Sequence, residues 1–127
     1  MALILVIDDD AAMRTLATDM VGFAGHETMA FDDGQKAHDY LQKPDRRLPD
    51  LILSDVMMPN LDGEHLCAML RADPDTKRIP VLLMSGKPQL RQAAETIGGS
   101  VVGFLAKPFT ISALKEALAK ALLQWPK

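Results

Sequence analysis

Acidic, hydroxyl and amino side chains follow four short apolar runs of this sequence, at the positions where the runs end. Asp55 follows residues 51–54. The runs at residues 3–7, 81–84 and 101–106 are followed by Asp8-Asp9-Asp10, Ser85 and Lys107. A carboxylate at the tip of a buried strand costs free energy unless it has a partner or a function. An acid cluster, a single acid, a hydroxyl and an amine are together the components of a metal-assisted phosphoryl site.

The apolar runs that precede these side chains have the features of buried β-strands. They are short, continuous and rich in branched residues, which is typical of strands covered on both faces. Residues 27–31 alternate in polarity and indicate a more exposed strand. We therefore predict five strands, at residues 3–7, 27–31, 51–54, 81–84 and 101–106.

Between the predicted strands, apolar residues recur at helical spacing. We predict helices at residues 11–24, 35–42, 64–71, 88–97 and 111–123. Asp10 and Thr110 are N-cap candidates for the first and last of these helices, because a short side-chain oxygen can accept a hydrogen bond from the first helical turn.

The alternation of strands and helices predicts a single α/β domain over residues 1–127. Such alternation implies a parallel sheet with helices on both faces and right-handed connections. In open α/β sheets, ligands bind outside the carboxyl ends of the strands, near the point where the strand order reverses. We therefore expect the polar side chains that follow the first, third, fourth and fifth strands to gather at one edge of the sheet.

Composition argues against several classes of protein. The formal net charge of −3 disfavours a basic nucleic-acid-binding face. No apolar run approaches the roughly 18 residues of a membrane span, and the N-terminus lacks the positive segment of a signal peptide. Cys67 is the single cysteine, which rules out an intrachain disulfide and fits a reducing compartment. We therefore expect a cytoplasmic protein.

Four motifs resemble those of the receiver domains of two-component response regulators. They are VIDDD at residues 6–10, SDVMMPNLDG at 54–63, MSG at 84–86 and FLAKPF at 104–109. The motifs follow the order and spacing of that family, and the resemblance covers about residues 3–123. It implies a flavodoxin-like, doubly wound sheet of five parallel strands in the order 2-1-3-4-5. The resemblance is to single-domain receivers of the chemotaxis-regulator kind.

The resemblance assigns the phosphoryl chemistry to Asp55, which would act as a nucleophile and become an acyl phosphate. Asp8 and Asp9 match the acidic pair that holds Mg²⁺ in the family, together with Asp55 and the backbone carbonyl of Met57. Mg²⁺ suits these ligands because it prefers an octahedron of oxygen atoms and retains several waters. Asp10 is interpreted as a helix cap.

Lys107, Ser85 and Phe104 match the phosphate-binding and switch positions of the family. Lys107 would place its ammonium against one phosphoryl oxygen, and Ser85 would donate its hydroxyl to another. Phe104 would rotate into the space freed by Ser85 and so switch the face formed by the fourth helix, fifth strand and fifth helix. A plain core role for Phe104 is the alternative. Met57 and Lys87 match two variable positions of the family, and the resemblance implies that they tune the lifetime of the phosphoryl group.

The resemblance implies a signalling switch rather than an enzyme, with no chemistry beyond its own phosphorylation and dephosphorylation. The implied partners are a sensor histidine kinase or a histidine phosphotransfer protein, and an unidentified downstream protein. Direct binding to nucleic acid or membrane is not expected. We expect a monomer or a weak, phosphorylation-dependent dimer.

Two other interpretations stay open at the level of sequence. The same module would also fit a receiver excised from a hybrid histidine kinase or from a longer multidomain regulator. A Mg²⁺-dependent aspartyl phosphatase or phosphotransferase also uses an aspartate nucleophile on an α/β sheet. Such enzymes usually carry a second acid two residues after the nucleophile, where this sequence has Met57.

Overall fold

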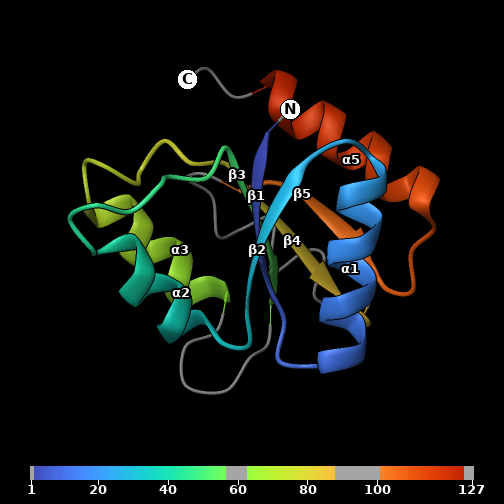
Figure 1. Cartoon of the computed structure of the whole chain (residues 1–127), viewed down its shortest axis with the longest axis horizontal. Coiled ribbons are helices and arrows are strands. Elements are labelled where there is room, and N and C mark those ends of the chain that lie inside the picture. Colours follow the sequence, from blue (N-terminus) through green and yellow to red (C-terminus); the bar gives the residue numbers. More distant parts are fainter. Residues whose placement is uncertain (1, 57–62, 88–100, 125–127) are drawn as a thin grey trace.

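The computed structural model describes residues 2–56, 63–87 and 101–124, which form a three-layer α/β structure. Five parallel strands make one sheet in the order β2-β1-β3-β4-β5 (Figure 1). The strands are β1 (Leu3–Ile7), β2 (Glu27–Phe31), β3 (Leu51–Asp55), β4 (Val81–Ser85) and β5 (Val101–Ala106). The described helices are α1 (Ala11–Phe23), α2 (Gly34–Leu41), α3 (Gly63–Ala72) and α5 (Ile111–Gln124). The predicted flavodoxin-like fold and its strand order are confirmed.

The observed elements differ little from the predicted ones. Two strands extend one residue further than predicted, so that Asp55 and Ser85 are themselves the last residues of β3 and β4. The helix predicted at residues 88–97 lies outside the described residues. None of the helices in the described part of the chain combines the length and the apolar composition that a membrane span requires.

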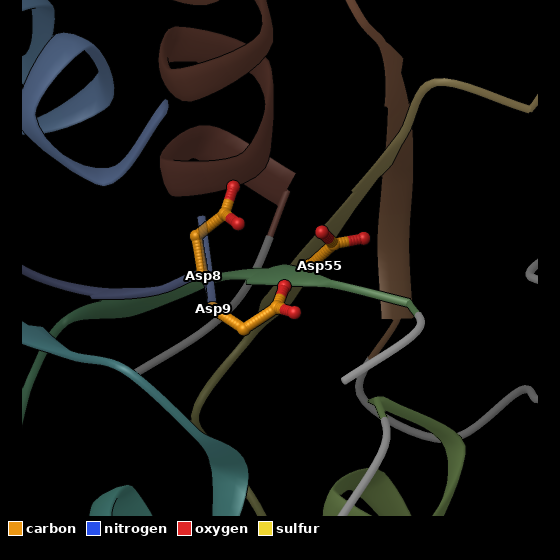
Figure 2. Close-up of side chains that lie close together, drawn as sticks. All are labelled: Asp8, Asp9 and Asp55. Carbon is orange, nitrogen blue, oxygen red and sulfur yellow. The ribbon is translucent and has the colours of Figure 1, made fainter. Parts of the chain in front are cut away.

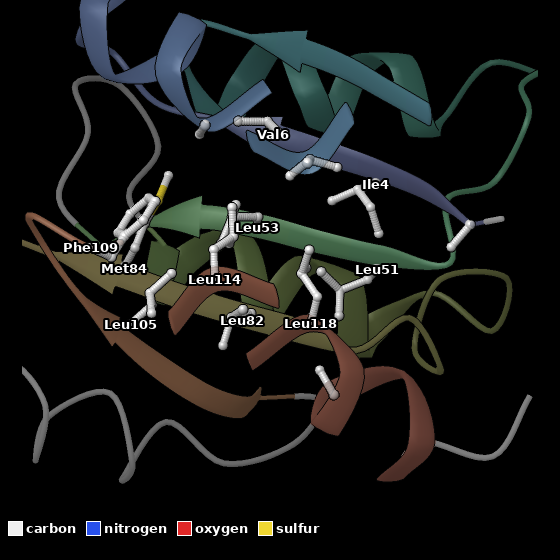
Figure 3. Close-up of a cluster of buried hydrophobic side chains, with 14 residues drawn as sticks. Ile4, Val6, Leu51, Leu53, Leu82, Met84, Leu105, Phe109, Leu114 and Leu118 are labelled. Atoms are coloured by element: carbon white, nitrogen blue, oxygen red, sulfur yellow. The ribbon is translucent and has the colours of Figure 1, made fainter. Parts of the chain in front are cut away.

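Alternate residues of the central strands point to opposite faces of the sheet. Ile4 and Val6 of β1 belong to the core cluster that α1 and α5 cover, whereas Leu5 and Ile7 belong to the cluster that α2 and α3 cover. Figure 3 shows the first of these clusters, where side chains of β1, β3, β4 and α5 lie together. A sheet that is packed on both faces holds its strand ends in fixed positions. The polar side chains at these ends are thereby held in fixed positions relative to one another.

Side-chain caps begin the two helices that flank the site. The Asp10 carboxylate accepts hydrogen bonds from the amides of Ala12 at 2.9 Å and Met13 at 3.2 Å, and so begins α1. The Thr110 hydroxyl accepts a hydrogen bond from the amide of Ala113 at 3.1 Å, at the start of α5. Both predicted N-caps are confirmed.

The strand order places the polar strand ends at one edge of the sheet. β1 and β3 are neighbours, and the pairing of Ile7 with Ser54 sets Asp8 beside Asp55. β5 lies at the far side of β4, so the side chain of Lys107 must extend past the end of β4 to meet the carboxylates.

Gly63 begins α3 in close contact with the backbone of β3. A Cβ atom at this position would lie 2.9 Å from the carbonyl oxygen of Asp55 and 3.1 Å from the Cα of Val56. The Gly63 amide also donates a hydrogen bond to the carbonyl oxygen of Val56 at 2.8 Å. Because backbone atoms cannot move aside as a flexible side chain can, glycine is the residue that lets α3 pack directly against the strand end that carries Asp55.

We expect Gly63→Ala to lower the free energy of unfolding by about 2 kcal/mol, because the added methyl group overpacks the backbone. Thermal unfolding followed by circular dichroism measures this loss. Gly22→Ala is the matched control, since Gly22 lies in α1 and an added Cβ would meet nothing within 4 Å. The control should gain about 0.5–1 kcal/mol from the higher helix propensity of alanine. Equal stability of the two variants would contradict the close contact.

Candidate functional site

Three carboxylates, which we call the acid cluster, gather where β1 and β3 end. Asp8 and Asp9 follow β1, Asp55 ends β3, and Figure 2 shows the three side chains close together. One carboxylate oxygen from each residue lies within 4.8 Å of the other two. Asp8 is fully buried, Asp9 is exposed, and the Asp55 side chain is 13% exposed. The acid cluster is therefore anchored at Asp8 and accessible to solvent at Asp9 and Asp55.

Lys107 brings a positive charge to the acid cluster from the end of β5. Its Nζ lies 2.7 Å from a carboxylate oxygen of Asp8 and 2.9 Å from a carboxylate oxygen of Asp55. Burial lowers the pKa of Lys107, but the hydrogen bonds to the two carboxylates raise it by more, so this pKa lies above the ordinary lysine value. Lys107 is therefore charged at neutral pH and holds the two carboxylates together.

Each polar group of Asp8 has a hydrogen-bond partner. Its amide donates to the carbonyl oxygen of Phe31 in β2 at 3.2 Å, and its carbonyl oxygen accepts from the Arg14 guanidinium at 2.8 Å. One carboxylate oxygen accepts from the amide of Asp10 at 2.9 Å and the other accepts from Lys107. A buried charge is tolerated only with partners of this kind. These hydrogen bonds therefore hold the Asp8 side chain in one position in the site.

The donor atoms of the acid cluster fit a hard divalent cation. Mg²⁺ binds oxygen ligands at about 2.1 Å, so opposite ligands of its octahedron are about 4.2 Å apart. The oxygen atoms of the acid cluster, all within 4.8 Å of one another, are close to this spacing. Three carboxylates and the Lys107 ammonium leave two negative charges, which match the charge of the ion. The predicted ligand carbonyl of Met57 lies outside the described residues.

We expect Mg²⁺ to raise the melting temperature, because the ion would bind the folded chain and offset repulsion within the acid cluster. At ten times the dissociation constant the gain is about 1.4 kcal/mol, or roughly 5 °C for a chain of this size. Thermal unfolding at increasing Mg²⁺ measures the shift, and Asp9→Asn should reduce it. Sodium chloride at equal ionic strength is the control, since salt screens all exposed charges. A shift that sodium chloride reproduces would contradict a specific metal site.

Ser85, Lys87 and Phe104 are the remaining predicted site residues that the structure describes. The Ser85 hydroxyl accepts a hydrogen bond from the amide of Lys87, an exposed residue, at 3.0 Å. The Ser85 carbonyl accepts from the amide of Lys107 at 2.8 Å, which ties β4 to β5 beside the site. The bond between Lys107 and Pro108 is cis. Phe104 is half-buried and packs against the core cluster under α2 and α3.

Gly63 and Arg14 also lie at this edge, although neither is a predicted site residue. Gly63 packs against the backbone of Asp55, and a signal for it exists, because it closes the motif that starts at Ser54. Arg14 donates to the carbonyl of Asp8. It carries no comparable signal, since an arginine on a helix surface is typically solvated.

Comparisons with known proteins identify relatives of this chain. A family model described as response regulator receiver domain matches residues 4–119. The chain is 35% identical to chemotaxis protein CheY-3 of Vibrio cholerae over 118 residues, which are 92% of this chain and 88% of that protein. It is 36% identical to response regulator MprA of Mycobacterium avium over 126 residues, which are 98% of this chain and 52% of that protein. The chain thus matches some relatives over most of their length and others over about half.

Solved structures share the fold. Chemotaxis protein CheY4 of Vibrio cholerae superposes with a TM-score of 0.81 at 29% sequence identity, covering 95% of this chain and 98% of that one. The signal receiver domain of a signal transduction histidine kinase from Syntrophus aciditrophicus superposes with a TM-score of 0.83 at 27% identity, covering 98% of this chain and 92% of that one. The fold is therefore shared both with a chemotaxis protein and with a domain of a kinase.

Proposed function

We propose, from the premise that this chain belongs to the family of response regulator receiver domains, that Asp55 is its phosphoryl acceptor in two-component signalling. The observation that carries the proposal is the contact of one ammonium with two carboxylates, since the Nζ of Lys107 bonds both Asp8 and Asp55. This contact keeps the partly exposed carboxylate of Asp55 beside an ammonium group that can donate hydrogen bonds to phosphoryl oxygens.

In the proposed reaction, a carboxylate oxygen of Asp55 attacks the phosphorus of the donor. A new O–P bond forms, and the P–N bond of a phosphohistidine, or the P–O bond of a small acyl phosphate, breaks with its electron pair leaving on the donor. Asp55 becomes an acyl phosphate. Lys107 would donate to one phosphoryl oxygen and Ser85 to another, because both lie at strand ends near Asp55.

Asp8, Asp9 and Asp55 are the residues that would hold Mg²⁺, with the carbonyl of Met57 as a further proposed ligand. When bound, the ion neutralises charge that accumulates on the transferring phosphoryl oxygens. Asp8 and Lys107 would orient Asp55 before a donor arrives, because their contacts are already formed in this structure.

The switch is reset when the acyl phosphate is hydrolysed. A water oxygen attacks phosphorus, the bond between phosphorus and Asp55 breaks, the carboxylate is restored and phosphate departs. We assign control of this step to Met57 and Lys87, which lie two residues past Asp55 and Ser85. An apolar Met57 would screen the attacking water, and Lys87 would attract the phosphate or a partner.

The proposed conformational change that a downstream protein would recognise starts at Ser85 and Phe104. Movement of the Ser85 hydroxyl toward a phosphoryl oxygen would break its contact with the Lys87 amide and change the packing near Phe104, which pairs with Leu83 of β4. The output face would comprise β5, α5 and the helix predicted at residues 88–97. Packing on this face would then differ between the two states, which is what a downstream protein needs to distinguish them.

The proposed phosphoryl donor is a sensor histidine kinase or a histidine phosphotransfer protein, and the proposed location is the cytoplasm. The chain's relatives include a protein of similar length and one about twice as long. A stand-alone receiver and a receiver within a hybrid kinase or longer regulator therefore both fit the comparisons. The reading frame of the gene distinguishes them.

Incubation with a small acyl phosphate, followed by intact-mass spectrometry, tests the proposed function. We expect one added phosphoryl group per chain with Mg²⁺ and none with excess chelator, because without a cation the acid cluster repels the donor phosphate. Labelling that is equally fast in chelator would contradict the metal-dependent mechanism.

A further inference from the structure

Arg14 contacts the peptide unit that joins Asp8 to Asp9. Its Nη1 donates a hydrogen bond to the Asp8 carbonyl oxygen at 2.8 Å, from a half-buried position in α1. The carbonyl of Asp8 and the amide of Asp9 belong to one planar unit. A contact that fixes this carbonyl therefore also fixes the amide nitrogen and the Cα of Asp9, from which its side chain extends.

Asp9 depends on this backbone contact more than Asp8 does. The Asp8 carboxylate is held directly, by the amide of Asp10 and by Lys107. The Asp9 carboxylate is exposed and receives no hydrogen bond from the residues that the structure describes. An exposed aspartate without a side-chain partner exchanges among rotamers, so the backbone sets where its oxygens lie on average.

The position of Arg14 is unfavourable for a cation in the absence of other contacts. It is the fourth residue of α1, and the N-terminal turn of a helix favours negative charge. A carbonyl acceptor and a nearby carboxylate offset this cost. The pKa of Asp32, in the turn after β2, is lowered mainly by its hydrogen bond with Lys36 and to a smaller degree by the charge of Arg14. The guanidinium thus donates to the carbonyl of Asp8 and its charge also acts on Asp32.

We infer that Arg14 is a positioning residue for the metal site, acting through the peptide between Asp8 and Asp9 without touching the ion or the phosphoryl group. The inference rests on the proposed function, which assigns Mg²⁺ to the acid cluster. Hydrogen bonds that orient a metal ligand typically change affinity by a factor of about 10–100. The charge of Arg14 alone predicts the opposite effect on Mg²⁺ affinity, because removal of a nearby positive charge strengthens the binding of a cation.

The dissociation constant of Mg²⁺ for the unphosphorylated chain, measured by isothermal titration calorimetry, separates these two effects. We expect Arg14→Met to raise it about tenfold. Arg14→Lys keeps the charge but not the planar donor, and its dissociation constant should lie between those of the wild type and Arg14→Met. Lys36→Met is the matched control, because it removes a neighbouring positive charge that pairs with Asp32 rather than with Asp8. Its dissociation constant should be unchanged or slightly lower.

Unchanged or tighter binding by Arg14→Met, with normal binding by the wild type, would overturn the inference and leave the proposed function intact. Absence of Mg²⁺ binding by the wild type would overturn both. If Arg14→Met does not fold, Arg14→Lys tests the inference, because it removes the planar donor and keeps the charge, and unchanged Mg²⁺ binding by this variant would then overturn the inference. Melting temperatures in chelator establish which variants are folded.

The labelling rate at different Mg²⁺ concentrations separates positioning from a direct role in phosphoryl transfer. Labelling of Arg14→Met by a small acyl phosphate should be slow at low Mg²⁺ and should return to the wild-type rate at saturating Mg²⁺. A rate that stays about tenfold low at saturation would assign Arg14 to the phosphoryl group and overturn the inference.

Discussion

Phosphorylation by a small acyl phosphate should be lost when Asp55 is replaced by asparagine. The amide has nearly the shape of the carboxylate but lacks the negative charge that attacks phosphorus. We expect the labelling rate to fall by roughly 10³-fold or more. The fold should be retained, because Asp55 lies at the very end of β3 and its side chain is partly exposed. Intact mass after incubation with the donor and Mg²⁺ measures the loss.

Asp45→Asn is the matched control for this variant. Asp45 is an exposed residue between α2 and β3, so the substitution makes the same chemical change away from the acid cluster. The control should acquire one phosphoryl group at the wild-type rate. Normal labelling of Asp55→Asn would place the acceptor on another residue and refute the assignment of Asp55.

Replacing Lys107 with methionine should destabilise the chain in the absence of metal. The substitution leaves a carboxylate oxygen of the fully buried Asp8 without its cation. Breaking a buried ion pair in this way costs about 3 kcal/mol, which corresponds to a fall in melting temperature of roughly 10 °C. Mg²⁺ should narrow the gap to the wild type, because the ion supplies positive charge to the same carboxylates. Thermal unfolding in chelator and at saturating Mg²⁺ measures both effects.

The same variant should also be labelled slowly. Loss of the ammonium removes a charge-assisted hydrogen bond to the transferring phosphoryl group, and we expect the rate to fall about a hundredfold. Lys120→Met is the control, because Lys120 pairs with Glu116 while both side chains are at least 68% exposed. Removal of such a pair should change stability by no more than about 1 kcal/mol. Wild-type melting of Lys107→Met in chelator would refute the stabilising role of Lys107.

The stabilising contribution of Lys107 should persist across neutral pH. Hydrogen bonds to Asp8 and Asp55 raise its pKa above the ordinary lysine value despite the opposing effect of burial. A group whose pKa is raised by folding contributes fully below its pKa in the unfolded chain, and the contribution is lost as pH rises through the raised value. The difference in stability between the wild type and Lys107→Met should therefore be constant through neutral pH and decrease in alkaline solution.

Much of the fold could be predicted from sequence because its signals are local. The continuous apolar runs of β1, β3 and β4 predict strands that are covered on both faces, and nearly all of these residues are buried. Asp10 and Thr110 begin their helices as their short side chains predict. The strand order came from the resemblance of motifs to a family, since apolar periodicity does not specify which strands become neighbours.

The amino-acid sequence alone shows which chemical groups end or follow the predicted strands, and their order along the chain. Acids follow β1 and end β3, a hydroxyl ends β4 and an amine follows β5. The tertiary structure decided which of these groups meet. Lys107 bonds two carboxylates that lie 99 and 52 residues away in sequence, and Arg14 bonds the carbonyl of Asp8. Backbone periodicity is set by neighbouring residues, whereas the contacts of a side chain depend on strands that only packing brings together.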